Sequence, residues 1–194
     1  MAKAKPLPGT ELPRTVREFD RWNADQPESW EFIAGVPVMM APPSLPHTII
    51  KGNVFAALRA KLAGTPCRAL VDGAEVKSKG LSAIPDVVVL CGQLDQSTPT
   101  IKEPVLLVEV VSPSSQRDDT QRKWQGYCLI PSLKHYLVVA QETRFVTLHT
   151  RTGPSSFLEE VFEEGLVDLS GLGASMTFDE IYADVVFPEP EPDA

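Results

Sequence analysis

Two carboxylates stand inside apolar stretches of this sequence of 194 residues. Asp86 lies in the run IPDVVVL, and Glu109 lies in the run PVLLVEVV. Moving a carboxylate out of water is unfavourable unless a cation or hydrogen-bond donors face it. The two acids therefore need partners, and a divalent metal ion shared by both is the sharpest candidate. The alternative is that unrelated arginine or lysine side chains neutralise each acid separately.

The scarcity of other ligands narrows the kind of metal that this pair can hold. The three histidines, His47, His135 and His149, are scattered, and the three cysteines follow no zinc-binding pattern. Carboxylate oxygens favour a hard cation, which predicts Mg²⁺ or Mn²⁺. An ion held by two carboxylates lowers the pKa of a bound water and polarises a phosphoryl oxygen. A lysine aimed at that water can orient it.

Motifs of several other enzyme classes do not occur in the sequence. Neither phosphate-binding pattern, G-x-G-x-x-G or G-x-x-x-x-G-K-[ST], is found, and neither are G-x-S-x-G and H-E-x-x-H. A sugar- or nucleotide-modifying enzyme would need a loop that cradles phosphate groups. The sequence therefore favours chemistry at the two carboxylates over these classes.

The two runs that carry the acids have the composition of strands buried on both faces. They are short, almost wholly apolar and rich in β-branched residues. SPSSQRDD then predicts the start of a helix at about 116–129, with Ser115 as N-cap and Asp118 three residues later. Lys123 and Tyr127 lie one turn apart in this helix, so they share a face.

The rest of the chain predicts helices and antiparallel hairpins around these strands. A tight turn at Ala34-Gly35 predicts a hairpin within 30–40, and an amphipathic helix follows at about 45–63. The shorter expected elements are a helix capped by Thr15 and Glu18, strands within 67–79 that turn at Asp72-Gly73, a hairpin of 135–140 and 144–150, short strands within 157–165 and 166–170, and a helix capped by Thr177 and Glu180. Together they predict one α/β or α+β domain with a mixed central sheet.

Composition limits the class of protein and its compartment. The formal net charge is −8, which argues against non-specific attraction to nucleic acid. No apolar run is long enough to span a bilayer, and residues 1–14, expected to be flexible, hold no secretory signal. Three widely spaced cysteines predict no disulfide framework. We therefore expect a cytoplasmic protein with a single domain over 15–187 and an acidic, proline-rich tail at 188–194.

The pattern around both acids resembles the putative restriction endonuclease family of bacteria, part of the PD-(D/E)XK nuclease superfamily. The resemblance runs through PDVVV, EVVSPSS and the lysine and tyrosine of the following helix. It extends to WEFIAGVPVMMAPPSLPHTII upstream and to HYLVVA and LSGLGASMTFDEIY downstream, and so covers residues 15–185. It implies a restriction-endonuclease-like fold, with a mixed central sheet flanked by helices and antiparallel hairpins.

The family resemblance also assigns roles to residues of the two strands and the helix. It implies that Asp86 and Glu109 bind the metal, with the backbone carbonyl of Val110 as a further ligand. Val111 stands two positions after Glu109, where the superfamily has its lysine. The lysine of this chain would instead come from the following helix, where Lys123 is the matching position.

Two further site residues come only from the resemblance. Glu31 and His47 match an acid and a histidine upstream in the family, and both would line the same site. The chain departs from the family after the helix. HYLVVA stands where a strand with tryptophan and aspartate is usual, and Ala140 replaces a common acid. These departures lie outside the proposed catalytic set.

The activity implied by the resemblance is metal-dependent hydrolysis of DNA phosphodiester bonds by an endonuclease that acts as a homodimer. The alternative is a catalytically weak or inactive nuclease-fold module that acts in binding or assembly. The acidic composition and the displaced lysine favour this alternative, because no basic stripe in the sequence follows a phosphate backbone. Binding of Mg²⁺ or Mn²⁺ separates the two hypotheses.

Overall fold

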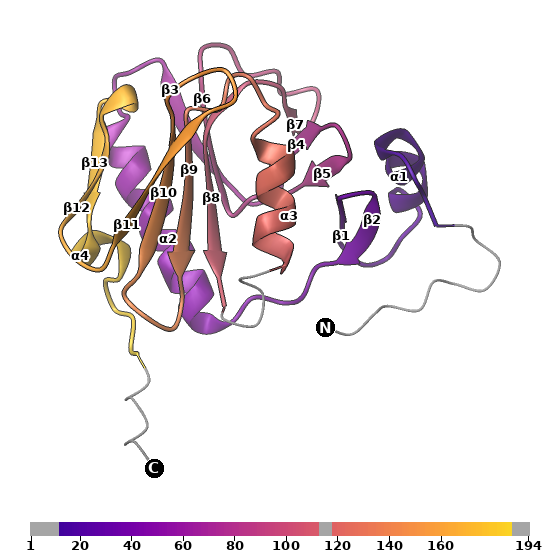
Figure 1. Ribbon diagram of the computed structural model, residues 1–194. Helices are drawn as coiled ribbons and strands as arrows, with labels where there is room; N and C mark the ends of the chain where they lie inside the picture. Colours follow the sequence, from indigo (N-terminus) through magenta and orange to yellow (C-terminus); the bar gives the residue numbers. More distant parts are fainter. Residues whose placement is uncertain (1–11, 113–117, 188–194) are drawn as a thin grey trace.

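The structure is a computed structural model that describes residues 12–112 and 118–187 (Figure 1). Within these ranges the helices are α1 (Val16–Asn23), α2 (Leu45–Lys61), α3 (Asp118–Tyr127) and α4 (Phe178–Ile181), with a short 3-10 helix at Ser170–Leu172. The strands are β1 (Trp30–Ile33), β2 (Val36–Met39), β3 (Cys67–Val71), β4 (Glu75–Ser78), β5 (Leu81–Ala83), β6 (Val87–Cys91), β7 (Thr100–Ile101), β8 (Pro104–Val111), β9 (His135–Ala140), β10 (Val146–Arg151), β11 (Phe157–Phe162), β12 (Leu166–Leu169) and β13 (Ala174–Thr177).

A mixed sheet forms the centre of the molecule, with the strand order β11-β10-β9-β8-β6-β3. β8 and β9 run parallel, and the other neighbours are antiparallel. All eight residues of β8 are buried, as expected for a strand rich in leucine and valine that is covered on both faces. The predicted mixed central sheet is therefore confirmed, and Glu109 lies in its interior.

Two hydrophobic cores cover this sheet, one on each face. Figure 1 shows α2 behind the sheet and α3 in front of it. The α2-side core joins the sheet to α2, α4, β12 and β13, and the α3-side core joins it to α3, β4 and β5. Side chains alternate along β8, so Val108 belongs to the α2-side core and Leu107 to the α3-side core. Glu109 shares the face of Leu107 and therefore points to the α3 side.

A smaller sheet, in the order β2-β1-β5-β4-β7, stands beside α3, which contacts both β1 and β5. The turn between β1 and β2 has a left-handed backbone at Ala34 and Gly35, with φ of 50° and 82°, as a tight hairpin of two residues requires. α1 packs on this hairpin through Phe19 and Phe32, whose ring centroids are 5.3 Å apart. The hairpin is thus held between α1 and α3.

α3 docks closely against β5 at Gly126. A Cβ atom at this position would lie 2.7 Å from Leu81 Cδ2, so only glycine fits without displacement. The Ser78 hydroxyl donates a hydrogen bond to the Gly126 carbonyl at 2.8 Å. Beyond the end of the helix, the Arg151 guanidinium donates to the Ile130 carbonyl at 2.8 Å. These contacts fix α3 against both sheets.

Most of the predicted elements are confirmed to within a few residues. The β1–β2 and β9–β10 hairpins, α2, and the capping box of Thr177 and Glu180 occur as expected. β5, β7 and β13 were not predicted, because β5 and β7 have only three and two residues and the ASMT of β13 contains no run of apolar or β-branched residues. The predicted N-cap Ser115 lies outside the described residues. Among the described helices, none has the length and apolar character needed to cross a bilayer.

Cys67 and Cys91 form a disulfide, so the expectation of no disulfide was wrong. They are 24 positions apart in sequence, but β3 and β6 pair antiparallel with Cys67 directly opposite Cys91. The odd number of cysteines argued against a disulfide framework, but two of the three pair and the third, Cys128, is free. Both bonded cysteines pack against the α2-side core. The bond therefore ties the edge strand β3 to the interior of the sheet.

Candidate active site

Glu109 belongs to a buried polar cluster between β8 and α3. Its carboxylate accepts a hydrogen bond from the Tyr127 hydroxyl at 2.7 Å, and the Lys123 ammonium lies 3.1 and 3.3 Å from its two oxygens. Lys123 and Tyr127 reach the same carboxylate because residues four apart on a helix share a face. The sequence predicted this shared face, and the structure confirms it.

Lys123 also connects the cluster to the small sheet. Its Nζ lies 2.9 Å from Glu31 Oε1, and the same oxygen accepts a hydrogen bond from the Ile84 N–H at 2.8 Å. Glu31 and Glu109 are only 5% and 6% exposed, so one ammonium serves two carboxylates that water barely reaches. Removal of Lys123 would leave both charges without a cation, which is the costly case for buried ions.

Asp86 joins the cluster from the position just before β6. The His47 Nε2 atom lies 2.8 Å from Asp86 Oδ1, and the Val110 N–H donates to Asp86 Oδ2 at 2.7 Å. The first turn of α2 places His47, because the hydroxyl of the N-cap Ser44 accepts a hydrogen bond from the His47 N–H at 3.2 Å. Asp86 is therefore oriented from two sides, by a helix start and by the backbone next to Glu109.

Among the described residues, three carboxylates share this cluster with a single lysine, and the pKa values reflect the imbalance. Burial, helped by the charges of Asp86 and Glu31, raises the pKa of Glu109 to about 7 although Lys123 acts in the opposite direction. Burial acts to lower the pKa of Lys123, but the carboxylates of Glu109 and Glu31 outweigh it and raise that pKa. Burial and the same two carboxylates raise the pKa of Tyr127, which stays a neutral donor. The cluster thus holds more negative charge than one ammonium balances.

The chemistry of Asp86 and Glu109 fits a hard divalent cation. Mg²⁺ in proteins is commonly held by one or two carboxylates while it keeps several waters, and a cation would offset the excess charge that raises the pKa of Glu109. Within the described part of the chain, no group of three or more His, Cys, Asp or Glu side chains is arranged to hold a metal ion. Two carboxylates alone suit a partly hydrated Mg²⁺ better than a zinc ion enclosed by four protein ligands.

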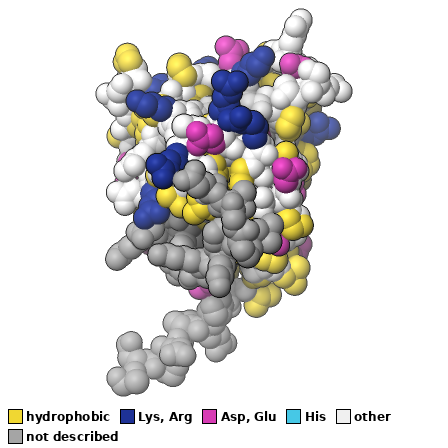
Figure 2. All heavy atoms as spheres, turned by 90° about the vertical axis from the view of Figure 1, so that its right-hand side faces the viewer, with side chains coloured by type: hydrophobic (Ala, Val, Ile, Leu, Met, Phe, Trp, Pro, Cys, Tyr) yellow, Lys and Arg dark blue, Asp and Glu magenta, His cyan; other side chains and the backbone are white. Residues whose placement is uncertain are grey.

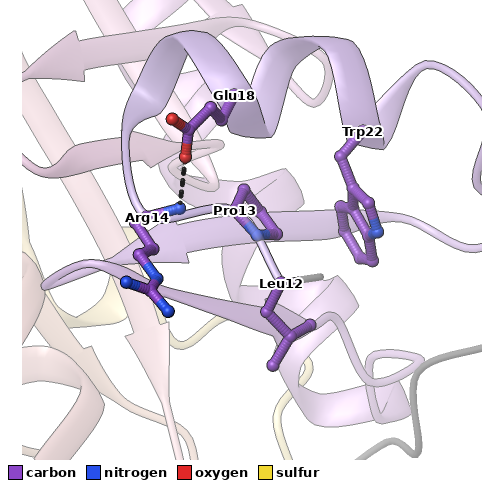
Figure 3. A pocket seen from close by; sticks show the side chains of 5 residues that line it. All are labelled: Leu12, Pro13, Arg14, Glu18 and Trp22. Atoms are coloured by element: carbon purple, nitrogen blue, oxygen red, sulfur yellow. Dashed lines mark hydrogen bonds between the residues drawn. The ribbon is translucent and has the colours of Figure 1, made fainter. Parts of the chain in front are cut away.

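A separate cavity of about 410 Å³ lies beside α1 (Figure 3). Its lining consists of Leu12, Pro13, Arg14, Glu18 and Trp22. The Glu18 carboxylate accepts a hydrogen bond from the Arg14 backbone N–H at 2.8 Å, as Figure 3 shows. No residue of the Glu109 cluster lines this cavity. The paired carboxylates, and not the cavity, therefore define the candidate site.

The structure brings the five predicted side chains into one cluster. His47 contacts Asp86, and Lys123 links Glu31 to Glu109. The elements that supply them are far apart in sequence, from β1 to α3. Their roles in binding a metal and in catalysis stay predictions, since proximity alone does not test them.

Sequence reasoning missed the backbone donors of the site. The N–H groups of Ile84 and Val110 hold Glu31 and Asp86, and no pattern of side-chain types reveals such donors. The predicted role of the Val110 carbonyl as a metal ligand stays a prediction. Tyr136 was also missed as a polar residue near the site, because HYLVVA has the composition of a core strand.

Comparison with known proteins identifies the family. A sequence model of the putative restriction endonuclease family matches residues 16–178. The chain belongs to this family. An uncharacterized protein of Synechocystis sp. (strain ATCC 27184 / PCC 6803 / Kazusa) is 27% identical over 187 residues, and the match covers 93% of this chain and 97% of that protein.

A solved structure supports the fold of this member of the putative restriction endonuclease family. The crystal structure of a putative nuclease from Anabaena variabilis ATCC 29413 matches with a TM-score of 0.72 and 17% sequence identity. The match covers 90% of this chain and 100% of that one. The predicted family and the predicted restriction-endonuclease-like fold are therefore both confirmed.

Proposed function

We propose that this chain is a Mg²⁺- or Mn²⁺-dependent endonuclease that hydrolyses phosphodiester bonds in DNA. The observation that carries the proposal is the convergence of Asp86, Glu109 and Lys123 in one buried cluster. Lys123 lies 3.1 Å from Glu109, and Asp86 is held at 2.7 Å by the N–H of Val110, the residue after Glu109. Two carboxylates and a lysine are the groups that metal-assisted hydrolysis of a phosphate ester needs.

In this proposal Asp86 and Glu109 hold the cation, with the Val110 carbonyl as a further ligand. A cation bound there supplies polarisation of a phosphoryl oxygen and a water of lowered pKa. His47 and the Val110 N–H fix the Asp86 carboxylate at 2.8 and 2.7 Å, so its orientation is set by the fold. Preorganised ligands of this kind raise both metal affinity and activity.

Lys123 positions the attacking water and offsets negative charge at the phosphate. Because two carboxylates raise its pKa, it keeps its proton at neutral pH and acts as a donor and a positive charge, not as a base. Glu31 holds the ammonium at 2.9 Å independently of Glu109. Lys123 can therefore stay in the site while Glu109 binds a cation.

Charge is spread unevenly over this acidic chain, and this bears on how DNA approaches it. On the side of the molecule that carries α1, Figure 2 shows several lysine and arginine side chains and fewer carboxylates. Arg17 and Arg21 of α1 are exposed and one turn apart, and Arg14 before the helix is also exposed. The same helix also exposes Glu18 and Asp20, so these arginines offer individual contacts to phosphate groups and not a continuous basic surface.

We also propose a homodimer, since many restriction-endonuclease folds cut both strands as twofold dimers. Strand β2 lies at the edge of the small sheet and exposes Val36 and Met39 at 49% and 39%. Sedimentation velocity is expected to show a dimer that Val36→Lys weakens, and a monomer at all concentrations would contradict this.

The predicted cytoplasmic location stays a proposal. It was based in part on the expectation of no disulfide, and the Cys67–Cys91 bond removes that support, since disulfides are rare in a reducing cytosol.

Cleavage of supercoiled plasmid with Mg²⁺ or Mn²⁺ tests the proposed activity. Wild type is expected to nick DNA, and Asp86→Ala is expected to lose at least roughly a hundredfold in rate. Asp95→Ala is the matched control, because Asp95 is an exposed acid that bonds to Ser97 away from the cluster. Equal inactivity of folded wild type and Asp86→Ala over many DNA substrates would defeat the proposal.

A second candidate function is that of a nuclease-fold module that binds or assembles without turnover. The observation that favours it is the ammonium of Lys123, which Glu31 and Glu109 already share at 2.9 and 3.1 Å. Calorimetric titration with Mn²⁺ separates the two candidates. A nuclease shows a site that disappears in Glu109→Ala, whereas no heat and no thermal shift in wild type support the module.

A further inference from the structure

Tyr136 carries a polar group that the site as described does not use. Its side chain is fully buried, and its hydroxyl has no hydrogen-bond partner within the described part of the chain. A buried hydroxyl without a partner is unfavourable, and folded proteins normally satisfy such groups with ordered water or a ligand where protein atoms do not. The hydroxyl of Tyr136 is therefore an unsatisfied hydrogen-bond donor that a bound water or ligand can satisfy.

The central sheet places Tyr136 on the same face as the metal-binding acid of β8. β9 runs parallel to β8, with Tyr136 opposite Leu107 and Val138 opposite Glu109. Leu107 and Tyr136 both belong to the α3-side core, and residues two apart on a strand point the same way. Tyr136 and Glu109 therefore both rise from the sheet towards α3.

Two aromatic residues of α3 fix the ring of Tyr136. Trp124 stacks on it at a centroid distance of 5.3 Å and an angle of 10°, and Tyr127 packs against it at 5.3 Å and 60°. Tyr127 is the residue whose own hydroxyl binds Glu109 at 2.7 Å. Packed against these rings, the side chain of Tyr136 is fully buried and its hydroxyl does not face bulk solvent.

The negative charge of the cluster acts on this hydroxyl. Burial, and then the carboxylates of Glu109, Asp86 and Glu31, raise the pKa of Tyr136 well above its ordinary value. The hydroxyl therefore keeps its proton and is a permanent donor. A fixed donor in the field of three carboxylates suits a water molecule, which can accept from the phenol and donate to a carboxylate.

We propose that Tyr136 is a positioning residue whose hydroxyl donates a hydrogen bond to a water molecule held among Glu109, Asp86 and Glu31. The inference depends on the proposed function for its last step, in which this water is a ligand of the cation held by Asp86 and Glu109. Tyr127 and Tyr136 then have separate tasks. Tyr127 orients the Glu109 carboxylate, and Tyr136 orients the solvent beside it.

Tyr136→Phe removes only the hydroxyl oxygen and tests this role in the full chain. Calorimetric titration with Mn²⁺ is expected to show roughly tenfold weaker binding than in wild type, as for other groups that orient metal ligands. Thermal unfolding without metal is expected to show a midpoint lowered by roughly 2–4 °C, because the water loses a donor. Tyr182→Phe is the control: its hydroxyl donates to the Phe145 carbonyl at 2.8 Å, and Mn²⁺ affinity is expected to stay unchanged.

Two readouts keep this inference separate from the proposed function. Where wild type binds Mn²⁺, the affinity decides: equal binding by Tyr136→Phe overturns the role of Tyr136, and weaker binding supports it. Where wild type binds no Mn²⁺, the metal-dependent function fails, and the thermal midpoint decides. A lower midpoint in Tyr136→Phe then supports a hydroxyl bonded to water, and an equal or higher midpoint shows an idle hydroxyl and overturns the proposal.

Discussion

The two faces of the central sheet are built from the same strands but differ in chemistry: one is apolar, and the other carries the candidate site. On the α2 side, β8 contributes apolar side chains such as Leu106 and Val108, which pack against α2. On the α3 side it contributes Leu107 and then Glu109. The α2 side requires only complementary shape and apolar area. The α3 side must in addition accommodate Glu31 and Glu109 around the ammonium of Lys123, with Asp86 nearby.

This difference separates the source of stability from the source of chemistry. A buried ion cluster adds little net stability, because the cost of removing charges from water largely offsets their attraction. The α2-side core contains no such charges and is reinforced by the Cys67–Cys91 disulfide. We infer that the α2 side provides most of the stability of the fold. The α3 side contributes less stability because it contains the charged candidate site. Changes on the two sides should therefore affect stability and metal binding differently.

Lys123→Met is expected to have the largest effect, because it leaves Glu31 and Glu109 buried without their shared cation. The free energy of unfolding at pH 8 should fall by about 3–5 kcal/mol, and by less at pH 5, where Glu109 can take up a proton. Urea unfolding at both pH values measures this. Lys51→Met, which removes a contact to the exposed Asp72, is the control, and equal losses for both variants would contradict the asymmetry.

Leu106→Ala tests the α2 side alone. The side chain is fully buried in the α2-side core, so its truncation should cost about 2–5 kcal/mol of unfolding free energy. The folded variant should still bind Mn²⁺ with wild-type affinity, because Leu106 points away from the acids. Urea unfolding and calorimetry measure the two quantities. A large loss of Mn²⁺ affinity in folded Leu106→Ala would show that the two sides are not separable.

Reduction of the Cys67–Cys91 disulfide tests the edge of the same core. Loss of a cross-link that spans 24 positions should lower the free energy of unfolding by about 3 kcal/mol. Urea unfolding with and without a reducing agent measures the change, and Cys67→Ser should reproduce it. Cys128→Ser, at the free cysteine, is the control and should leave the difference between oxidised and reduced protein intact. Identical unfolding of both forms would count against a stabilising bond.

Gly126→Ala tests how far the site depends on the docking of α3. The added Cβ would lie 2.7 Å from Leu81 Cδ2, so α3 must shift, at a cost of about 1–3 kcal/mol. Because Lys123 and Tyr127 lie on this helix, Mn²⁺ affinity should fall together with stability. Gly52→Ala, in α2, is the control, since a Cβ there meets no atom within 4 Å. Unchanged metal binding in Gly126→Ala would show that the lysine tolerates movement of its helix.

The pH dependence of stability tests the excess negative charge on the α3 side. The pKa of Glu109 is about 7 in the folded protein and near 4.5 when unfolded, so between these values the folded state holds a proton that the unfolded state has released. Stability should therefore fall as pH rises through this window, by at most about 1.4 kcal/mol per pH unit. Glu109→Gln should flatten this slope in urea unfolding from pH 4.5 to 8. A slope that the variant retains must come from other groups.

The parts of the fold that depend on local chemistry were predictable from the sequence. The hairpin at Ala34-Gly35 and the capping box at Thr177 follow from turn and cap preferences that act within a few residues. Strand β8 followed from its composition, because only a doubly covered strand is apolar on both faces. The disulfide did not follow, since the register that sets Cys67 opposite Cys91 is a property of the folded sheet.

The candidate site was predictable to a different extent for each residue. Asp86 and Glu109 stood out because charges inside apolar runs are costly. Glu31 and His47 are ordinary residues for a hairpin and a helix start, so only the family resemblance singled them out. Tyr136 was not predicted, because the sequence does not reveal whether the hydroxyl of a tyrosine in a core strand has a hydrogen-bond partner. That depends on the neighbouring side chains of the folded protein.

Because α3 supplies the lysine, the candidate site is complete only after this helix has packed against the small sheet. A lysine two residues after Glu109 on β8 would sit beside its carboxylate as soon as that strand formed. Lys123 arrives only when α3 closes against β1 and β5, where it meets Glu31. A partly folded chain in which α3 has not docked therefore carries Asp86 and Glu109 without Lys123 beside them. Under the proposed function, a chain whose α3 has not docked would hold the two acids but would lack the lysine that hydrolysis needs.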